Sequence, residues 1–265
     1  MRVLPRKRSR LSFIQRKSPN KLMGGQDTFG AENLVKVFDG RTVVDRVSIF
    51  LTRKEVVGLL GPNGAGKTTT FYMMVGLTQP DNGKVLLDGT DITQEPMYVR
   101  ARKGVTYLAQ EPSVFRKLSV EDNILAILEA RGIPYHERMQ RTTQALADLN
   151  IEHLRSQKAG SLSGGERRRL EITRALATEP RFMLLDEPFA GIDPLAVADL
   201  QQIIKELKDR GLGIIITDHN VRETLSVCDR AYIIHQGKIL VDGTPEQIVH
   251  SEVARGVYLG EDFNL

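Results

Sequence analysis

A glycine-rich segment of eight residues constrains the fold of this chain more than any other feature. Residues 61–68 read Gly-Pro-Asn-Gly-Ala-Gly-Lys-Thr, which fits the phosphate-binding pattern G-x-x-x-x-G-K-[ST]. The apolar run 56–60 has the length and β-branched content of a buried strand, and residues 69–75 favour a helix. This order of strand, loop and helix predicts an α/β fold with a mostly parallel sheet covered by helices.

Each residue type in this segment suits contact with phosphate groups. Glycines let several backbone N–H groups face one anion, and the following helix adds free N–H groups and the positive end of its dipole. Lys67 is expected to reach the β- and γ-phosphates, and the Thr68 hydroxyl to bind Mg²⁺. The predicted nucleotide site comprises Gly61, Pro62, Asn63, Gly64, Ala65, Gly66, Lys67, Thr68 and Thr69.

The pattern of strands and helices changes along the chain. Residues 34–38 and 42–49 suggest a hairpin around an Asp-Gly turn, which predicts an antiparallel β part at the N-terminal side. Between about 111 and 180 strand signals give way to long helical patterns, and alternation resumes afterwards. We therefore expect one domain over 30–265, with a helical subdomain at about 111–180 and a C-terminal segment at about 245–265.

Residues 1–29 are expected to form a basic, disordered extension, because they lack periodicity. Eight Lys and Arg residues and one Asp give residues 1–30 a charge of +7, which leaves −3 for the rest of a chain whose total is +4. The extension is open to four interpretations. It could contact anionic lipid or nucleic acid, it could be an organelle transit peptide, translation could begin at Met23 and not at Met1, or it could be a solvated tail. The mildly acidic remainder is not typical of a DNA-binding surface, so we expect no nucleic-acid partner.

Two further features concern the setting of the chain. No apolar run approaches the ~20 residues needed to cross a bilayer, so a role at a membrane would require a partner. The single cysteine, Cys228, excludes an internal disulfide and fits a reducing, cytoplasmic setting. Because it lies among apolar residues, we expect Cys228 to fill space in the core.

A second segment has the form of a magnesium-binding strand. The apolar residues 182–185 lead to Asp186 and Glu187, and a strand of this kind delivers its last residues to the carboxyl edge of the sheet. Asp186 is expected to help hold Mg²⁺, and Glu187 to orient or deprotonate the attacking water. The alternative is a strand that ends in surface acids.

A third segment, Leu-Ser-Gly-Gly-Glu at 162–166, precedes an arginine-rich helix. Ser163 can cap that helix, and the two glycines leave its N-terminus accessible. The chain therefore has a second helix end suited to binding an anion.

Together these segments resemble the nucleotide-binding subunits of ABC transporters, over about residues 31–245. The resemblance implies an ATPase of the P-loop NTPase fold that uses ATP and Mg²⁺. It identifies Gln110 as a Mg²⁺ ligand that also senses the partner subunit. It further identifies Asp193 as the acidic residue of the D-loop, His219 as the switch histidine that contacts the γ-phosphate, and Phe38 as the aromatic residue that stacks on adenine. The catalytic residues it implies are Glu187, His219, Gln110 and Lys67, and the Mg²⁺ ligands are Thr68, Gln110 and Asp186.

The resemblance also implies a head-to-tail homodimer. Each nucleotide would lie between the P-loop of one chain and the signature segment of the other, so that ATP joins the two chains and hydrolysis releases them. The signature residues that would contact ATP are Ser163, Gly164, Gly165 and Glu166.

Within this family the chain is most similar to the ATPases of lipopolysaccharide exporters. The likeness lies in 71–76, 164–169, 189–194, 217–225 and the ending 257–263. It implies two transmembrane permease subunits, a location on the cytoplasmic face of the inner membrane, and lipopolysaccharide that is moved by the complex without binding this chain.

Residues 114–118 match the segment that helps form the permease groove in those ATPases. Phe115 beside Arg116 would anchor a partner helix, and the alternative is an ordinary core phenylalanine. Two residues depart from the pattern of those ATPases: Ala109 stands where a proline is expected, and Phe38 where a tyrosine is more usual.

Two other functions remain open. One is the ATPase of another transporter, such as an importer of branched-chain amino acids. The other is a soluble ABC ATPase in DNA repair or translation, which the single cassette and the absence of heptads disfavour.

Overall fold

Three apolar strands with both faces buried form the centre of the protein. The computed structural model describes residues 25–260, 263 and 265, and it buries every residue of β3 (Val56–Leu60), β7 (Phe182–Asp186) and β8 (Gly213–Thr217). Strands buried on both faces are typical of a parallel sheet covered by helices. The six-stranded sheet, of order β10-β9-β3-β8-β7-β6, is completed by β6 (Val105–Leu108), β9 (Arg230–His235) and β10 (Lys238–Gly243).

The direction of these strands positions the functional loops. β9, β3, β8, β7 and β6 run parallel, and only β10 pairs antiparallel, at the edge beside β9. Because the carboxyl ends of parallel strands share one edge of a sheet, the loops after β3, β7 and β8 lie next to one another.

A second sheet covers one side of the first. Its strands β1 (Thr28–Phe38), β2 (Arg41–Thr52), β4 (Asn82–Leu87) and β5 (Thr90–Asp91) pair antiparallel in the order β2-β1-β4-β5. Helix α1 (Lys67–Val75) packs between the sheets, since its Phe71 and Met73 share one apolar core with residues of both. The predicted fold class, with its antiparallel part and mostly parallel core sheet, is confirmed. β1 begins at Thr28, two residues before the expected boundary at 30.

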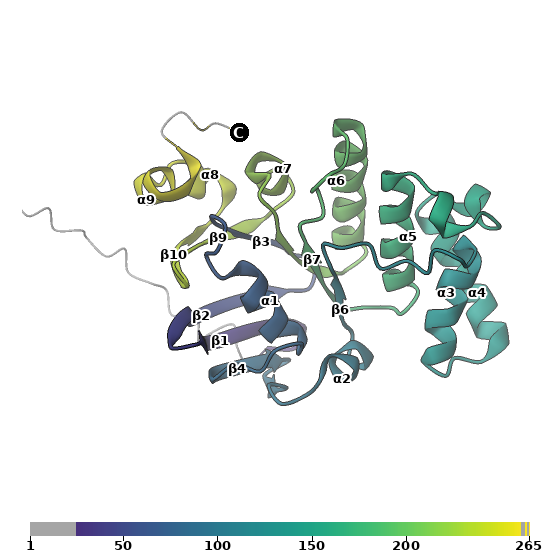
Figure 1. The fold of residues 1–265 in the computed structure, drawn as a ribbon, viewed down its shortest axis with the longest axis horizontal. Helices are drawn as coiled ribbons and strands as arrows, with labels where there is room; N and C mark the ends of the chain where they lie inside the picture. Colours follow the sequence, from purple (N-terminus) through teal and green to yellow (C-terminus); the bar gives the residue numbers. More distant parts are fainter. Residues whose placement is uncertain (1–24, 261–262, 264) are drawn as a thin grey trace, which may run out of the picture.

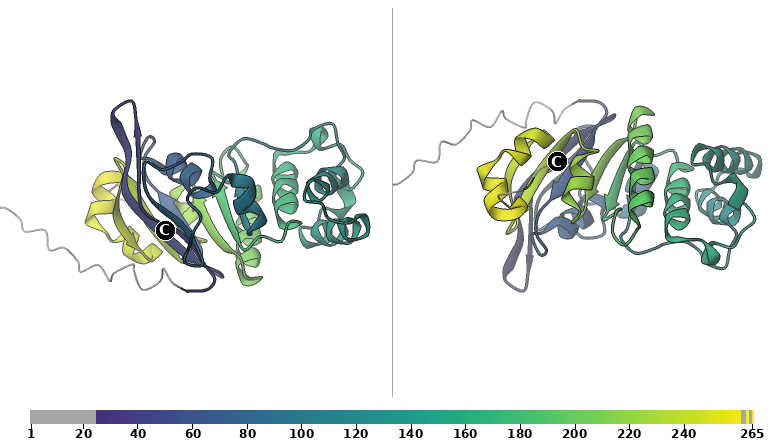
Figure 2. Two further views of the ribbon diagram at one scale, coloured as in Figure 1. Left: turned by 90° about the horizontal axis from the view of Figure 1, so that it is seen from below. Right: turned by 90° about the horizontal axis from the view of Figure 1, so that it is seen from above.

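The helical insert is a separate layer with its own core. We call α3 (Val120–Ala130), α4 (Tyr135–Asp148) and α5 (Gly164–Leu176) the helical lobe, which also contains the short turns η2 (Glu152–Leu154) and η3 (Ala159–Ser161). Their apolar side chains form a cluster distinct from the sheet cores. Figures 1 and 2 show this lobe at one end of the molecule, away from the antiparallel sheet.

The remaining helices cover the parallel sheet and its edges. They are α2 (Met97–Arg102), α6 (Pro194–Asp209), α7 (Val221–Leu225), α8 (Pro245–Val249) and α9 (Glu252–Ala254), with a π-helical turn η4 (Arg255–Leu259) after α9. The alternation of strands and helices expected after about residue 180 includes α6 and α7, whereas α2 and the C-terminal helices are too short to give a clear period.

Several expectations concern single segments. Residues 1–24 of the expected basic extension lie outside the described residues. Cys228 is buried, as predicted. Within the described residues, no helix combines the length and apolar character needed to cross a membrane.

Candidate active site

The glycine-rich loop after β3 owes its shape to close packing against its neighbours. Gly61 has φ 156°, and a Cβ there would lie 2.1 Å from the carbonyl oxygen of Ile234 in β9. Gly66, the N-cap of α1, has φ 107° and would place a Cβ 2.8 Å from the carbonyl oxygen of Val43. Only glycine fits both positions, so the loop can turn its backbone amides towards one centre.

Lys67 is folded into this loop. Its ammonium group is buried and donates to the carbonyl oxygens of Gly61 at 2.7 Å and Pro62 at 3.1 Å. Burial lowers the pKa of Lys67, while the carboxylates of Glu187, Asp186 and Asp218 oppose that change. Because these oxygens hold the cation only by hydrogen bonds, an anion in the loop would compete for it. Thr68 and Thr69, which follow it, are exposed and partly exposed.

Asp186 ends β7 as a buried carboxyl group. The hydroxyl of Tyr107 in β6 donates to its Oδ2 at 3.0 Å. Burial raises the pKa of Asp186, and the hydrogen bond from Tyr107 counteracts it. Burial also raises the pKa of Tyr107, so that its hydroxyl stays a donor. The sequence did not predict Tyr107, although its place near the end of a neighbouring parallel strand was a usable signal.

Three predicted catalytic residues meet next to Asp186. The backbone of Glu187 has φ 45°, an unusual conformation for this residue, and its N–H donates to the carbonyl oxygen of Thr217 at 2.7 Å. Its Oε2 accepts a 2.7 Å hydrogen bond from Nε2 of Gln110 and lies 3.6 Å from Nδ1 of His219. The fold therefore brings together residues from the ends of β6, β7 and β8.

Asp218 is a buried acid that the sequence analysis did not assign. Its side chain is fully buried and accepts hydrogen bonds from the backbone N–H groups of Phe189 at 2.8 Å and Asn220 at 2.9 Å. Burial raises its pKa. Its Oδ1 also lies 3.4 Å from Nδ1 of His219, so Asp218 joins the loop after β7 to the loop that carries His219. Its position directly before His219 was the available signal.

Phe38 presents an aromatic ring at the end of β1. Its side chain is 46% exposed, and the ammonium group of Lys36 lies 5.3 Å from the ring centroid. Lys36 in turn pairs with Asp81 at 2.9 Å. An exposed ring held in this way has a face open for stacking.

The signature segment forms the exposed N-terminus of α5. The Oγ of Ser163 accepts from the N–H of Glu166 at 3.3 Å, and Oε2 of Glu166 accepts from the N–H of Ser163 at 2.8 Å. The hydrogen bond with Ser163 lowers the pKa of Glu166. A Cβ added to Gly164 would meet no atom within 4 Å, and one added to Gly165 only the Cβ of Ala196 at 3.5 Å.

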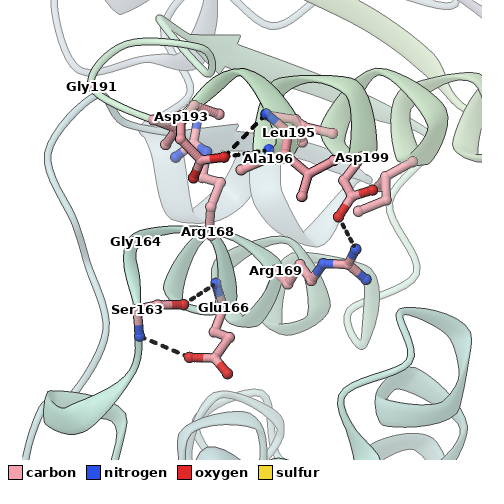
Figure 3. A pocket seen from close by; sticks show the side chains of 14 residues that line it. Ser163, Gly164, Glu166, Arg168, Arg169, Gly191, Asp193, Leu195, Ala196 and Asp199 are labelled. Atoms are coloured by element: carbon pink, nitrogen blue, oxygen red, sulfur yellow. Dashed lines mark hydrogen bonds and ion pairs between the residues drawn. The ribbon is translucent and has the colours of Figure 1, made fainter.

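A cleft of about 520 Å³ lies between α5 and α6 (Figure 3). Asp193 caps α6 by accepting from the N–H groups of Leu195 at 3.1 Å and Ala196 at 3.0 Å, so two helix N-termini border the cleft. Arg168 lines it as a buried cation whose Nε and Nη2 have no hydrogen-bond partner among the described residues. Three carboxylates also line the cleft and Arg168 pairs with Glu171 at 2.9 Å, so it is the open N-terminus of α5 that favours an anion at the mouth of the cleft.

The predicted partner groove is partly exposed. Phe115 has 45% of its surface exposed, so its interpretation as a core residue is wrong. The guanidinium carbon of Arg174 lies 5.0 Å from its ring centroid, and Asn123 accepts from its backbone N–H at 2.8 Å. Arg116 is also exposed. The carbonyl oxygen of Ala109 accepts from Arg168 at 3.2 Å, so the segment before Gln110 is tied to the helical lobe.

The predicted site residues therefore form two groups. The P-loop residues, Gln110, Asp186, Glu187 and His219 cluster at the carboxyl edge of the parallel sheet. The signature residues lie on the helical lobe. Within the described part of the chain, the hydrogen bonds of Ser163 and Glu166 stay within their own helix end.

Comparisons with known proteins show the family of this chain. The profile of the ABC transporter family matches residues 44–190. The chain is 57% identical over 235 residues to the lipopolysaccharide export system ATP-binding protein LptB of Acidithiobacillus ferridurans, covering 89% of this chain and 98% of that protein. It is 54% identical over 239 residues to LptB of Escherichia coli K12, covering 90% and 99%.

A solved structure shows the same fold. The ADP conformation of MJ1267, an ATP-binding cassette of an ABC transporter, superimposes with a TM-score of 0.79 at 29% identity. The match covers 88% of this chain and 98% of that one.

Proposed function

Because this chain belongs to the ABC transporter family and is an ATPase of that family, we propose that it powers the export of lipopolysaccharide. The observation that carries the proposal is the identity of 54–57% with lipopolysaccharide export ATP-binding proteins, over about nine-tenths of the chain and nearly their whole length. The shared region includes both groups of site residues. The chain would hydrolyse ATP while its partners move the lipid.

ATP binding starts at the P-loop. Residues 61–69 wrap the phosphates, and Lys67 exchanges the carbonyl oxygens of Gly61 and Pro62 for the β- and γ-phosphates. The exposed ring of Phe38 stacks on the adenine; a phenylalanine keeps this stacking although it lacks the hydroxyl of a tyrosine.

The side chains around Asp186 suit Mg²⁺ bound together with phosphate. No group of three or more acidic, histidine or cysteine side chains within residues 25–260 forms a metal cage. Mg²⁺ commonly takes only one or two carboxylates and completes its shell with water and phosphate oxygens. The oxygen donors of Thr68, Gln110 and Asp186 fit that pattern. When bound, the ion would neutralise charge that develops on the phosphates.

The carboxylate cluster then serves hydrolysis. Glu187 orients the attacking water and accepts its proton, and His219 contacts the γ-phosphate. The hydrogen bond from Gln110 to Glu187 links this step to the helical lobe, because the segment before Gln110 is held by Arg168.

The signature segment completes the site of a second chain. The N-terminus of α5, with Ser163, Gly164, Gly165 and Glu166, faces solvent and is suited to the γ-phosphate on a partner chain. Asp193 lies at the adjacent helix end. This arrangement supports a head-to-tail homodimer that closes around two ATP molecules.

Two transmembrane permease subunits of the LptF/LptG kind are the proposed partners. Phe115 and Arg116 present an aromatic ring and a cation on the exposed side of the helical lobe, where a permease helix would dock. The chain would then be peripheral on the cytoplasmic face of the inner membrane, and lipopolysaccharide would pass through the permeases without binding it.

Affinity purification from the native host tests this function. We expect the tagged chain to bring down two permease chains from gently solubilised membranes, identified by mass spectrometry. Replacing Phe115 with alanine should reduce that recovery about tenfold and leave the ATPase of the isolated chain unchanged. Tyr135→Ala, which removes an exposed aromatic ring elsewhere on the helical lobe, is the matched control.

The outcomes separate the alternatives. Recovery of amino-acid permeases would replace lipopolysaccharide by another substrate and leave the ATP site unchanged. Recovery of ribosomes or DNA without membrane proteins would refute transport. A loss of basal ATPase in Phe115→Ala would show that this ring supports the fold and not the partner.

A further inference from the structure

A stretch of chain without regular secondary structure separates two of the proposed functional residues. We call residues 109–115 the linking segment; they follow β6 and belong to no helix or strand. Gln110 near its start donates to Glu187 at 2.7 Å, and the exposed Phe115 at its end lies in the proposed permease groove. Because no helix or strand pairs the backbone of this segment, other groups must fix its position.

One face of α5 supplies those groups. Arg168, Glu171 and Arg174 follow one another at intervals of three residues, which places them on the same side of the helix. Nη1 of Arg168 donates to the carbonyl oxygen of Ala109 at 3.2 Å. Nη1 of Arg174 donates to the carbonyl oxygen of Ser113 at 2.7 Å. The linking segment is therefore held by side chains of the helix that begins at the signature segment.

Glu171 is the central member of this face. It is buried, and its two carboxylate oxygens have different partners. Oε1 accepts from the backbone N–H of Ser113 at 2.7 Å, and Oε2 accepts from Nη1 of Arg168 at 2.9 Å. Since the same Nη1 also reaches Ala109, this one carboxylate holds the linking segment on both sides of Gln110, once directly and once through Arg168.

The burial of this ion pair indicates a role in geometry. The side chains of Arg168 and Glu171 are only 10% and 5% exposed. Desolvation of two buried charges offsets most of their attraction, so such a pair is weak evidence for a purely stabilising role. Its hydrogen bonds instead fix the distance between α5 and the linking segment.

We propose that Glu171 is a positioning residue for Gln110, which it sets against the carboxylate of Glu187 by holding the linking segment on α5. Glu171 acts through these contacts and not on the nucleotide. Its loss should therefore lower the turnover number and leave ATP binding at the P-loop unchanged. The inference deepens the proposed function: it rests on the roles proposed for Gln110 and Glu187 in hydrolysis, and it is independent of the substrate that the transporter moves.

The test is a double-mutant cycle on the isolated chain. Glu171→Gln keeps the shape of the side chain but loses one of its two hydrogen bonds, because an amide has one acceptor oxygen. We expect kcat to fall about ten- to a hundredfold, since a displaced catalytic group costs that much. ATP affinity, measured in the Glu187→Gln background, should stay the same. Gln110→Ala alone should also lower kcat, and adding Glu171→Gln to it should lower kcat by less than about twofold, because the group that Glu171 positions is already absent.

A second variant guards against a loss of folding. Glu171→Gln removes the counter-charge of a buried arginine, so the free energy of unfolding is measured for each variant. Glu171→Asp keeps the charge and shortens the side chain, and it should show the same pattern of kcat in the two backgrounds. The control is Glu129→Gln, which breaks an exposed ion pair with Arg138 on the helical lobe and should leave kcat unchanged.

The outcomes are distinct. Parent kcat in both Glu171 variants, with kcat lowered in Gln110→Ala, would overturn the inference and leave the proposed function intact. An equal loss of kcat with and without Gln110→Ala would also overturn it, because Glu171 would then support the fold and not Gln110. Parent kcat in Gln110→Ala would refute the proposed role of Gln110, and the inference with it.

Discussion

The two proposed phosphate-binding ends of this chain differ in how far a single chain completes them. At the P-loop, Lys67 and Asp186 are buried and have partners from the same chain. At the signature segment, Ser163 and Gly164 are exposed, and the hydrogen bonds of Ser163 stay within its own helix end. The first end is organised before any ligand arrives, and the second presents an open surface.

Two glycines show the same difference at atomic scale. A Cβ on Gly61 would lie 2.1 Å from a backbone oxygen of the same chain, whereas one on Gly164 would meet nothing within 4 Å. The glycine at the P-loop is thus required by the fold of this chain. The glycine at the signature segment leaves space that this chain does not use, which supports the proposal that a second chain brings its nucleotide there.

The largest expected effect lies in the carboxylate cluster at the P-loop end. Glu187→Gln should lower ATP turnover about 10²–10⁴-fold, because the proton acceptor is lost while the contacts of the phosphates remain. The variant should therefore accumulate as an ATP-bound dimer, which size-exclusion chromatography with light scattering detects. Glu206→Gln on the exposed side of α6 is the control. Turnover at the normal rate would refute the role of Glu187.

Gly61→Ala should damage the fold itself. The added methyl group collides with the carbonyl oxygen of Ile234, and we expect a loss of about 3 kcal/mol or more in the free energy of unfolding. Chemical denaturation measures it. Gly64→Ala, at φ 75° with open space around the added carbon, should lose only about 1 kcal/mol. Similar losses at both positions would show that the close contact is unimportant.

Gly164→Ala should lower ATP turnover and leave the stability of the fold almost unchanged. The added carbon has free space and the residue lies within α5, so the free energy of unfolding should stay within about 1 kcal/mol of the parent. ATP turnover should fall about tenfold, because the methyl group separates the helix N-terminus from the phosphate of the second chain. Unchanged turnover would argue that no phosphate approaches this helix end.

The smallest effect concerns an ion pair that joins the start of β7 to the end of β4. Arg181 binds both oxygens of Asp88, at 2.7 and 3.0 Å, and lowers the pKa of that carboxyl group. Asp88→Asn should cost about 1 kcal/mol of unfolding free energy at pH 7, with unchanged ATP affinity. Because the folded pKa lies below the unfolded one, the difference persists above about pH 4 and shrinks as the pH falls through the folded value. Denaturation series across pH test this, and a difference that grows in acid would contradict it.

The sequence predicted the P-loop end well because its signals are local. A fixed spacing of glycines, lysine and threonine between a strand and a helix leaves few alternatives, and Asp186 ends a strand of obvious pattern. The strand boundaries differ more: β1 starts six residues before the predicted strand at 34–38, because its first part alternates weakly.

Contacts between distant segments could not be predicted in this way. Nothing in the local pattern shows that Tyr107 binds Asp186, that Arg168 binds Ala109, or that Tyr258 packs beside the P-loop. These contacts depend on strand order and on the packing of short C-terminal helices, which carry little periodicity of their own. The local pattern around Phe115 likewise does not show that its ring is exposed.

If the two ends complete each other between chains, two inactive variants should restore activity when they are mixed. Lys67→Ala disables the P-loop end, and Gly164→Glu places a carboxylate at the signature end where the chain itself leaves space. In a head-to-tail dimer, a mixed pair contains one site with an intact P-loop and an intact signature segment. We expect an equimolar mixture to hydrolyse ATP well above the sum of the rates of the two variants measured alone. A mixture with no more activity than that sum would contradict it.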